Sequence, residues 1–312
     1  SHLAQALEVG QFGIALPHLF VQSDYASLIS PRVASCAMVE LLGPGLLGGH
    51  KWSGGVCALD DVIYCIPYHG AKQVLAINTR TGAQEVLEGE FPGQDKWRGG
   101  VLGKDGVVYG IPFSSPQVIA INPQGRHAEL VGPALEGSYK WFGGVTGPDG
   151  IVYCIPFDAL HVLAFDPRMH TAEPAGPELP GSAKWSGGVL GPDGIIYGIP
   201  YNSSRVLAFD PQARMAELVG PELHGNFKWV GGVLGKDGII YRLPFRSSKV
   251  LAFDPVTRSA EVTDIDLPDD RMWGSCEDHG GASVLGLDGI IYGIPFDAER
   301  VIAFDPVARS AS

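Results

Sequence analysis

The sequence predicts an all-β fold built from repeated four-stranded antiparallel units, and three observations support this prediction. First, the six tryptophans follow one another at intervals of 44 or 45 residues, and a fixed period in the forties is typical of arrays and propellers. Second, most repeats carry an Asp-Gly pair between two apolar stretches, which is a strong β-hairpin signal. Third, no segment of the repeat region shows a helical period of apolar residues.

The fourth repeat shows how each unit divides into strands. The text "GGVLG" predicts the first strand, and the turn "PDG" leads into "IIYGIP", the second. A polar loop precedes the third, "RVLAF", and "DPQAR" places Asp and Pro where a type I turn favours them, before the fourth, "AELVG". The predicted strands are therefore residues 187–191, 195–200, 205–209 and 216–220.

A four-stranded antiparallel unit that occurs about six times is typical of a propeller blade. The last repeat reads "VIAFDPVARSAS" and stops, so we expect it to end before its fourth strand. Residues 38–52 match residues 215–229, which carry a fourth strand. We therefore predict that an N-terminal strand completes the last blade and leaves no free edge.

These expectations give a six-bladed β-propeller over residues 37–312, preceded by a partly irregular N-terminal extension over residues 1–36. A seven-bladed propeller is the alternative, because residues 12–31 faintly resemble a second and a third strand.

The "GPDGIIY…VLAFDP" core, present in six drifting copies, resembles the repeats of NHL and gluconolactonase/streptogramin-lyase propellers. The resemblance implies the fold and no particular activity, because many activities share it. Gluconolactonase-type enzymes need carboxylate and amide ligands around a divalent cation in the channel. The expected channel strands, "GGVLG" and its variants, offer no Asp, Glu, His or Asn. The fourth strands also lack the docking tryptophan of quinoprotein propellers, so no cofactor is predicted.

Composition narrows the class of partner. A net charge of −12 repels phosphate backbones and argues against nucleic acid. No apolar run reaches roughly 18 residues, so no membrane span is predicted. Three of the five cysteines, at positions 57, 65 and 154, replace Leu or Gly of sister repeats. This favours a soluble protein in a reducing compartment over a disulfide framework; the compartment itself is not indicated.

The Lys-Trp pairs before the expected channel strands are candidate binding residues at the rim. A ring of cations could attract an anionic group, and the indole faces could stack on sugars. Alternatively, each Trp packs between blades and each Lys extends to water. The residues are Lys51, Trp52, Lys96, Trp97, Lys140, Trp141, Lys184, Trp185, Lys228, Trp229, Arg271 and Trp273.

The expected loops between second and third strands differ from blade to blade. They read "YHGAKQ", "FSSPQ", "FDALH", "YNSSR", "FRSSK" and "FDAER". Ser, Asn and Asp beside an aromatic residue would suit a multivalent sugar binder, and they also suit ordinary polar turns.

The sixth repeat carries an acidic insert. Glu277, Asp278 and His279, next to Cys276, are candidate metal ligands, and four aspartates lie just upstream in residues 263–270. The alternative is an exposed acidic loop, because successive side chains of an extended chain point apart. Loops longer than those of sister repeats often carry function.

The strong likeness between repeats favours a non-enzymatic propeller that serves as a protein-interaction or scaffold module, with no catalytic residue assigned. A multivalent carbohydrate binder with repeated rim sites is one alternative. A metal-dependent lactonase or hydrolase that uses the insert is the other. The expected partner is a protein or a small polar or anionic ligand.

Overall fold

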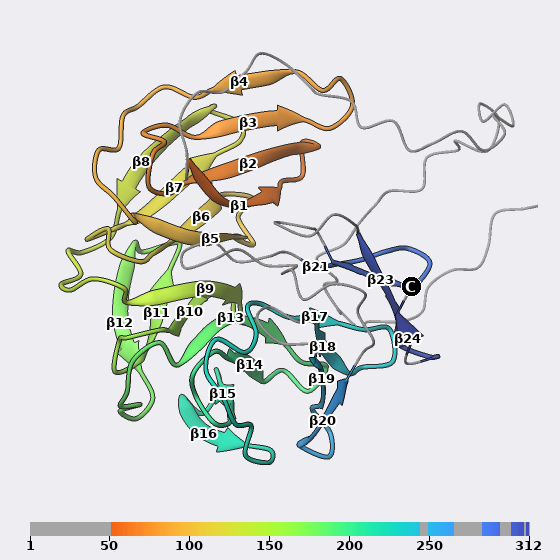
Figure 1. Cartoon of the computed structure of the whole chain (residues 1–312). Helices are drawn as coiled ribbons and strands as arrows, with labels where there is room; N and C mark the ends of the chain where they lie inside the picture. Colours follow the sequence, from red (N-terminus) through yellow and green to blue (C-terminus); the bar gives the residue numbers. More distant parts are fainter. Residues whose placement is uncertain (1–50, 244–248, 265–282, 294–300, 309, 312) are drawn as a thin grey trace, which may run out of the picture. The chain divides into compact units, whose positions relative to one another are not determined.

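The computed structural model describes residues 51–243, 249–264, 283–293, 301–308 and 310–311. In these ranges it contains six four-stranded antiparallel sheets, each formed by four consecutive strands (Figure 1). The predicted all-β fold of four-stranded units is confirmed. No helix in the described ranges has the length and the apolar character that crossing a membrane requires.

The strands recur in the same order in each sheet. The first strands are β1 (Trp52–Cys57), β5 (Trp97–Leu102), β9 (Trp141–Thr146), β13 (Trp185–Leu190), β17 (Val233–Leu234) and β21 (Ser283–Leu285). The second strands are β2 (Val62–Pro67), β6 (Val108–Pro112), β10 (Val152–Pro156), β14 (Ile196–Pro200), β18 (Ile240–Arg242) and β22 (Ile291–Gly293).

The outer half of each sheet is equally regular. The third strands are β3 (Leu75–Asn78), β7 (Val118–Asn122), β11 (Val162–Asp166), β15 (Val206–Asp210), β19 (Lys249–Asp254) and β23 (Ile302–Asp305). The fourth strands are β4 (Gln84–Val86), β8 (His127–Val131), β12 (Thr171–Ala175), β16 (Met215–Val219), β20 (Ser259–Asp264) and β24 (Ser310–Ala311).

The turn aspartates hold the first hairpin of every sheet. In the fourth sheet, Asp193 accepts the Ile195 N–H at 3.1 Å and the Tyr197 hydroxyl at 2.6 Å. The equivalent Tyr–Asp bond is present in the other five sheets, between Tyr64 and Asp60, Tyr109 and Asp105, Tyr153 and Asp149, Tyr241 and Asp237, and Tyr292 and Asp288. These carboxylates therefore act as turn residues.

The glycine pair in each of the first five repeats permits close approach between neighbouring repeats. Gly187 has a φ of 77°, and a Cβ placed on it would lie 2.8 Å from the Cα of Gly231, just before the first strand of the next sheet. The pairing of β13 with β14 shifts register between Trp185 and Gly188 at this point. A side chain at Gly187 would therefore meet both backbone strain and the neighbouring repeat.

The apolar core lies between successive sheets. Trp141, for example, packs with Tyr109 and Ile111 of the second sheet and with Val152 and Leu163 of its own. Trp97, Trp185 and Trp229 occupy equivalent clusters between their sheets. The predicted packing of tryptophan between blades is thus what these four side chains do.

The end of the chain differs from the prediction. The expectation that the last repeat ends before its fourth strand is wrong, because β24 pairs with β23, with Phe304 opposite Ala311. The two residues after the final turn suffice to continue the antiparallel ladder. The predicted closing N-terminal strand and the segment that suggests a seventh blade lie outside the described residues. The chain divides into Ser1–Leu41 and Leu42–Ser312, and the expected boundary at residue 37 stays a prediction.

Candidate functional site

Two sets of loops form one end of the sheets, which we call the loop face. It consists of the loops after second strands and the loops that lead into first strands. Backbone hydrogen bonds join the two sets across sheets: Lys140 N–H donates to Phe113 O at 2.8 Å, and Phe157 N–H donates to Lys140 O at 2.9 Å. The loops concerned are residues 68–74, 113–117, 157–161 and 201–205, and residues 87–96, 132–140, 176–184 and 220–228.

The lysine before each tryptophan is directed into the loop face. Lys184 is 4% exposed, and its Nζ donates to the carbonyls of Phe157, Ala159 and Gly181, each at 2.9 Å. Two of these carbonyls belong to the preceding blade. The ammonium group therefore clamps the loop after the second strand of one blade to the loop that leads into the first strand of the next blade.

The same clamp recurs along the chain. Lys96 Nζ donates to the carbonyls of Tyr68, Ala71 and Gly93 at 2.6–3.0 Å. Lys140 Nζ donates to Ser115 O of the preceding blade and to Gly137 O. Lys228 Nζ donates to Gly225 O of its own loop, so the bond between blades is shown for Lys96, Lys140 and Lys184.

Burial has a cost for these ammonium groups. Loss of hydration lowers the pKa of each of the four lysines to about 8. Because only 3–5% of Lys96, Lys140, Lys184 and Lys228 is exposed, the interpretation in which each Lys reaches water is wrong for these four residues. Lys51, at the start of the described chain, is half-buried, with its Nζ 5.9 Å from the Trp52 ring centroid.

Each tryptophan that the structure describes also uses its polar atom within its own blade. Trp97 Nε1 donates to Gln117 O at 2.8 Å, just before the third strand. Trp52, Trp141, Trp185 and Trp229 make the same bond to Gln73, His161, Arg205 and Lys249. The five Trp side chains thus tie the first strand to the third.

Polar residues of the second-to-third loops cap the next blade. Asp158 Oδ1 accepts the Ala183 N–H at 2.6 Å, and Asn202 Oδ1 accepts the Phe227 N–H at 2.9 Å. Ser114 Oγ accepts the Tyr139 N–H at 3.4 Å. We call these bonds the inter-blade latches. Three of the loop side chains that suggested sugar sites therefore have a structural role.

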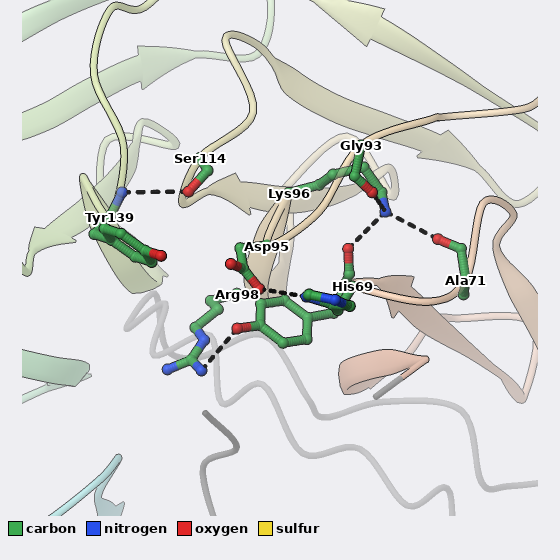
Figure 2. Close-up of polar contacts among 9 residues, drawn as sticks. His69, Ala71, Gly93, Asp95, Lys96, Arg98, Ser114 and Tyr139 are labelled. Carbon is green, nitrogen blue, oxygen red and sulfur yellow. Dashed lines mark hydrogen bonds and ion pairs between the residues drawn. The ribbon is translucent and has the colours of Figure 1, made fainter. Parts of the chain in front are cut away.

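The junction between the first two sheets departs from this pattern. In place of a side-chain-to-backbone latch, His69 Nδ1 and Asp95 Oδ1 lie 2.9 Å apart (Figure 2). The His69 side chain is 38% exposed and that of Asp95 is 21% exposed. Both residues thus border solvent at the rim of the loop face.

Arg98 extends the same network inward. Its guanidinium donates to the Tyr68 hydroxyl at 3.0 Å (Figure 2). Its central carbon lies 4.9 Å, 4.7 Å and 4.6 Å from the ring centroids of Tyr68, Phe113 and Phe142. A weakly hydrated planar cation suits such aromatic surroundings.

The carboxylate at the centre of this network is held in its ionised form. Burial alone would raise the pKa of Asp95. Hydrogen bonds from His69 and Tyr68, together with the charge of Arg98, outweigh burial and lower that pKa below its usual value. The junction therefore presents a fixed negative charge, hydrogen-bonded to an imidazole that is partly open to solvent.

This cluster was not among the predicted site residues, although the sequence carries a signal for it. Asp95 stands where sister repeats have Tyr139, Ala183 and Phe227, and Arg98 stands where they have Ser, Phe or Val. Two positions that are uncharged in those sister repeats are thus charged here, and they meet His69 at one junction. Departures of this kind are where a repeated fold can acquire a single site.

Several predicted site residues are not part of the described chain. Arg271, Trp273 and the proposed metal ligands Glu277, Asp278 and His279 lie outside the described residues. Within the ranges that are described, no three His, Cys, Asp or Glu side chains gather in a group that could hold a metal ion. The binding roles proposed for the Lys-Trp pairs stay predictions.

Comparison with known proteins identifies the architecture. No protein-family model and no curated protein matches the sequence. Among solved structures, virginiamycin B lyase from Staphylococcus aureus matches with a TM-score of 0.68 at 13% identity, covering 84% of this chain and 83% of that chain. The chain has a β-propeller fold.

Two further solved structures are similar to this chain. A catalytically inactive histidine-to-alanine variant of the staphylococcal lyase, solved with quinupristin, matches with a TM-score of 0.67 at 13% identity, covering 84% and 83% of the two chains. The extracellular domain of a one component system from B. thetaiotaomicron matches with a TM-score of 0.60 at 10% identity, covering 84% of this propeller and 36% of that chain. At these identities the likeness establishes the fold alone.

Proposed function

We propose that this chain is a non-enzymatic propeller that binds another protein through its loop face. The observation that supports the proposal is that the repeated side chains and the variable side chains have different roles. Residues that repeat from blade to blade have structural roles: the clamp lysines bond one blade to the next, and the tryptophans brace their own blade and pack against its neighbour. Residues that differ between blades, such as Asp95, Tyr139 and Ala183, lie at the rim of the loop face.

A protein surface is recognised by an irregular set of side chains spread over several loops. The loop face offers such a set on a scaffold that the clamps and latches make rigid. The His69–Asp95 pair adds one fixed charge at a defined place. A repeated small-ligand site would instead need equivalent exposed groups in each blade.

The test blocks the loop face and asks whether binding is lost. Ser138 is exposed on the loop face, and Gln212 is exposed in a turn at the opposite end of the strands. Each is changed to Cys in a background without the five native cysteines, and each is then coupled to a polyethylene glycol maleimide. Random peptides displayed on phage are selected on both proteins and on the uncoupled chain.

We expect peptides to enrich on the uncoupled chain and on the Gln212→Cys adduct, and enrichment to be lost on the Ser138→Cys adduct. Equal enrichment on the two adducts would contradict the proposed use of the loop face. Failure to enrich on any of the three proteins would contradict a protein-binding role.

A further inference from the structure

The residue before each clamp lysine holds a side chain out from the loop face. Asp95, Tyr139, Ala183 and Phe227 have φ values of 51°, 54°, 47° and 53°. This left-handed conformation is strained for residues with a Cβ, and most of all for bulky ones, whereas glycine adopts it freely. Stability alone would favour glycine at positions 139 and 227.

Two of these side chains are aromatic and remain open to solvent. Tyr139 is 44% exposed and Phe227 is 41% exposed. Tyr139 meets Phe113 edge-on with ring centroids 5.0 Å apart, and Phe227 meets Tyr201 in the same way at 5.3 Å.

A third ring connects the two pairs. Phe157 lies 5.6 Å from Phe113 and 5.6 Å from Tyr201, measured between ring centroids. We call these five residues, Phe113, Tyr139, Phe157, Tyr201 and Phe227, the aromatic rim. Because each exposed ring rests on a buried one, the rim is a preformed surface that loses little side-chain entropy on binding.

The exposed charged side chains of the loops around the aromatic rim are mostly acidic. The eight loops of the loop face contain seven carboxylates, those of Glu88, Glu90, Asp95, Glu136, Asp158, Glu178 and Glu222. Apart from the buried clamp lysines, their cations are Lys72 and Arg205, and Arg205 lies 3.9 Å from Glu222. The clamp lysines keep their charge, but they are buried beneath the loops. The charged side chains that these loops expose are therefore mostly carboxylates, which are complementary to a cation.

We propose that the loop face recognises a peptide segment of its partner in which Arg or Lys adjoins an apolar residue. The cation lies over the Tyr139 or Phe227 ring and faces the loop carboxylates, while the apolar neighbour covers the rest of the aromatic rim. This inference rests on the proposed function and specifies the chemistry of the partner.

The experiment uses random dodecapeptides displayed on phage and selected on the unmodified full chain. Enriched peptides are sequenced, synthesised and titrated by fluorescence anisotropy against the full chain and four variants. Tyr139→Ser and Phe227→Ser each remove one exposed ring, and Tyr139→Phe keeps the ring. Met169→Ser changes a side chain that is 70% exposed in the turn after β11, at the opposite end of the strands, and serves as the matched control.

We expect the enriched peptides to carry net positive charge, with Arg or Lys beside an apolar residue. Tyr139→Ser should weaken their binding by about tenfold, a typical loss for an aromatic contact residue, with less than a twofold change for Tyr139→Phe and Met169→Ser. Thermal unfolding of each variant establishes that it is folded before titration.

Two results would overturn the inference and leave the proposed function standing. One is enrichment of neutral or acidic peptides. The other is that the folded Tyr139→Ser and Phe227→Ser variants both bind the enriched peptides as tightly as the unmodified chain does. Absence of any enriched peptide would overturn both the inference and the proposed function.

Discussion

Lys184 shows at the scale of one residue how a charged side chain can serve as internal structure. Its ammonium group donates to three carbonyls from two blades while 4% of the residue is exposed. Hydrogen bonds to a charged donor are stronger than neutral ones, and losing the donor leaves buried acceptors without partners.

Replacement of the clamp should therefore destabilise the fold. We expect Lys184→Met to lower the free energy of unfolding by about 2–4 kcal/mol, measured by urea denaturation. Lys104→Met is the control, because Lys104 is exposed and its Nζ reaches Pro148 O at the opposite end of the strands. Equal effects of the two substitutions would show that the clamp contributes nothing beyond the loss of a lysine.

The clamp lysines also make stability depend on pH. Burial lowers the pKa of Lys96, Lys140, Lys184 and Lys228 to about 8 from an ordinary 10.5. Between these two values the unfolded chain binds more protons than the folded chain, so the free energy of unfolding rises with pH. Below pH 8 both states are protonated and this dependence disappears.

We therefore expect urea midpoints to increase from pH 8 to pH 9.5, with a smaller slope in Lys184→Met than in the unmodified chain. The window ends there because the buried tyrosines act in the opposite direction. Burial raises the pKa of Tyr197 above its usual value of 10. As the pH rises beyond 10, this tyrosine therefore lowers the free energy of unfolding. A midpoint that is flat or falls between pH 8 and 9.5 would contradict the expected cost of burying the lysines.

At the scale of the element, the first four blades are joined to one another at two places. Clamp lysines join their loops, and the glycines of β1, β5, β9 and β13 approach one another at the inner edges. A Cβ on Gly143 would lie 2.9 Å from the Gly187 Cα, where both partners are backbone. The close approach therefore depends on the absence of a side chain.

Two glycines with similar φ values separate backbone strain from this close approach. Gly143 has a φ of 69°, and Gly194 has a φ of 83° with nothing within 4 Å of its Cβ position. We expect Gly194→Ala to cost about 1 kcal/mol of unfolding free energy from strain alone. Gly143→Ala should cost at least about 3 kcal/mol because it adds a clash between blades. Equal costs would mean that the first strands can separate freely.

At the scale of the whole molecule, the repeat determined most of what could be predicted. The Trp spacing, the Asp-Gly turns and the Asp-Pro turns predicted the strands of the fourth repeat to within two residues. These patterns predict the strands well because turn residues, and the alternation of apolar and polar residues along a strand, determine structure over short stretches of chain. Packing of the tryptophans and the role of the glycine pair also followed from residue size.

The polar contacts across blades could not be predicted in the same way. Lys96 Nζ finds Tyr68 O at a separation of 28 residues, and His69 finds Asp95 at a separation of 26. Such pairs depend on how two blades meet, which periodicity within one blade does not specify. The position of Asp95 and Arg98 outside the repeat consensus was the available signal for the junction.

The central claim is that repeated residues hold this propeller together and that recognition resides in residues that differ between blades. The number of ligands bound per chain tests it most directly. Native mass spectrometry of the full chain with an enriched peptide, and separately with mixed neutral sugars, measures that number. We expect one peptide bound per chain at saturation. Several equivalent adducts of one ligand would contradict it and would favour the carbohydrate-binding alternative with a site in each blade.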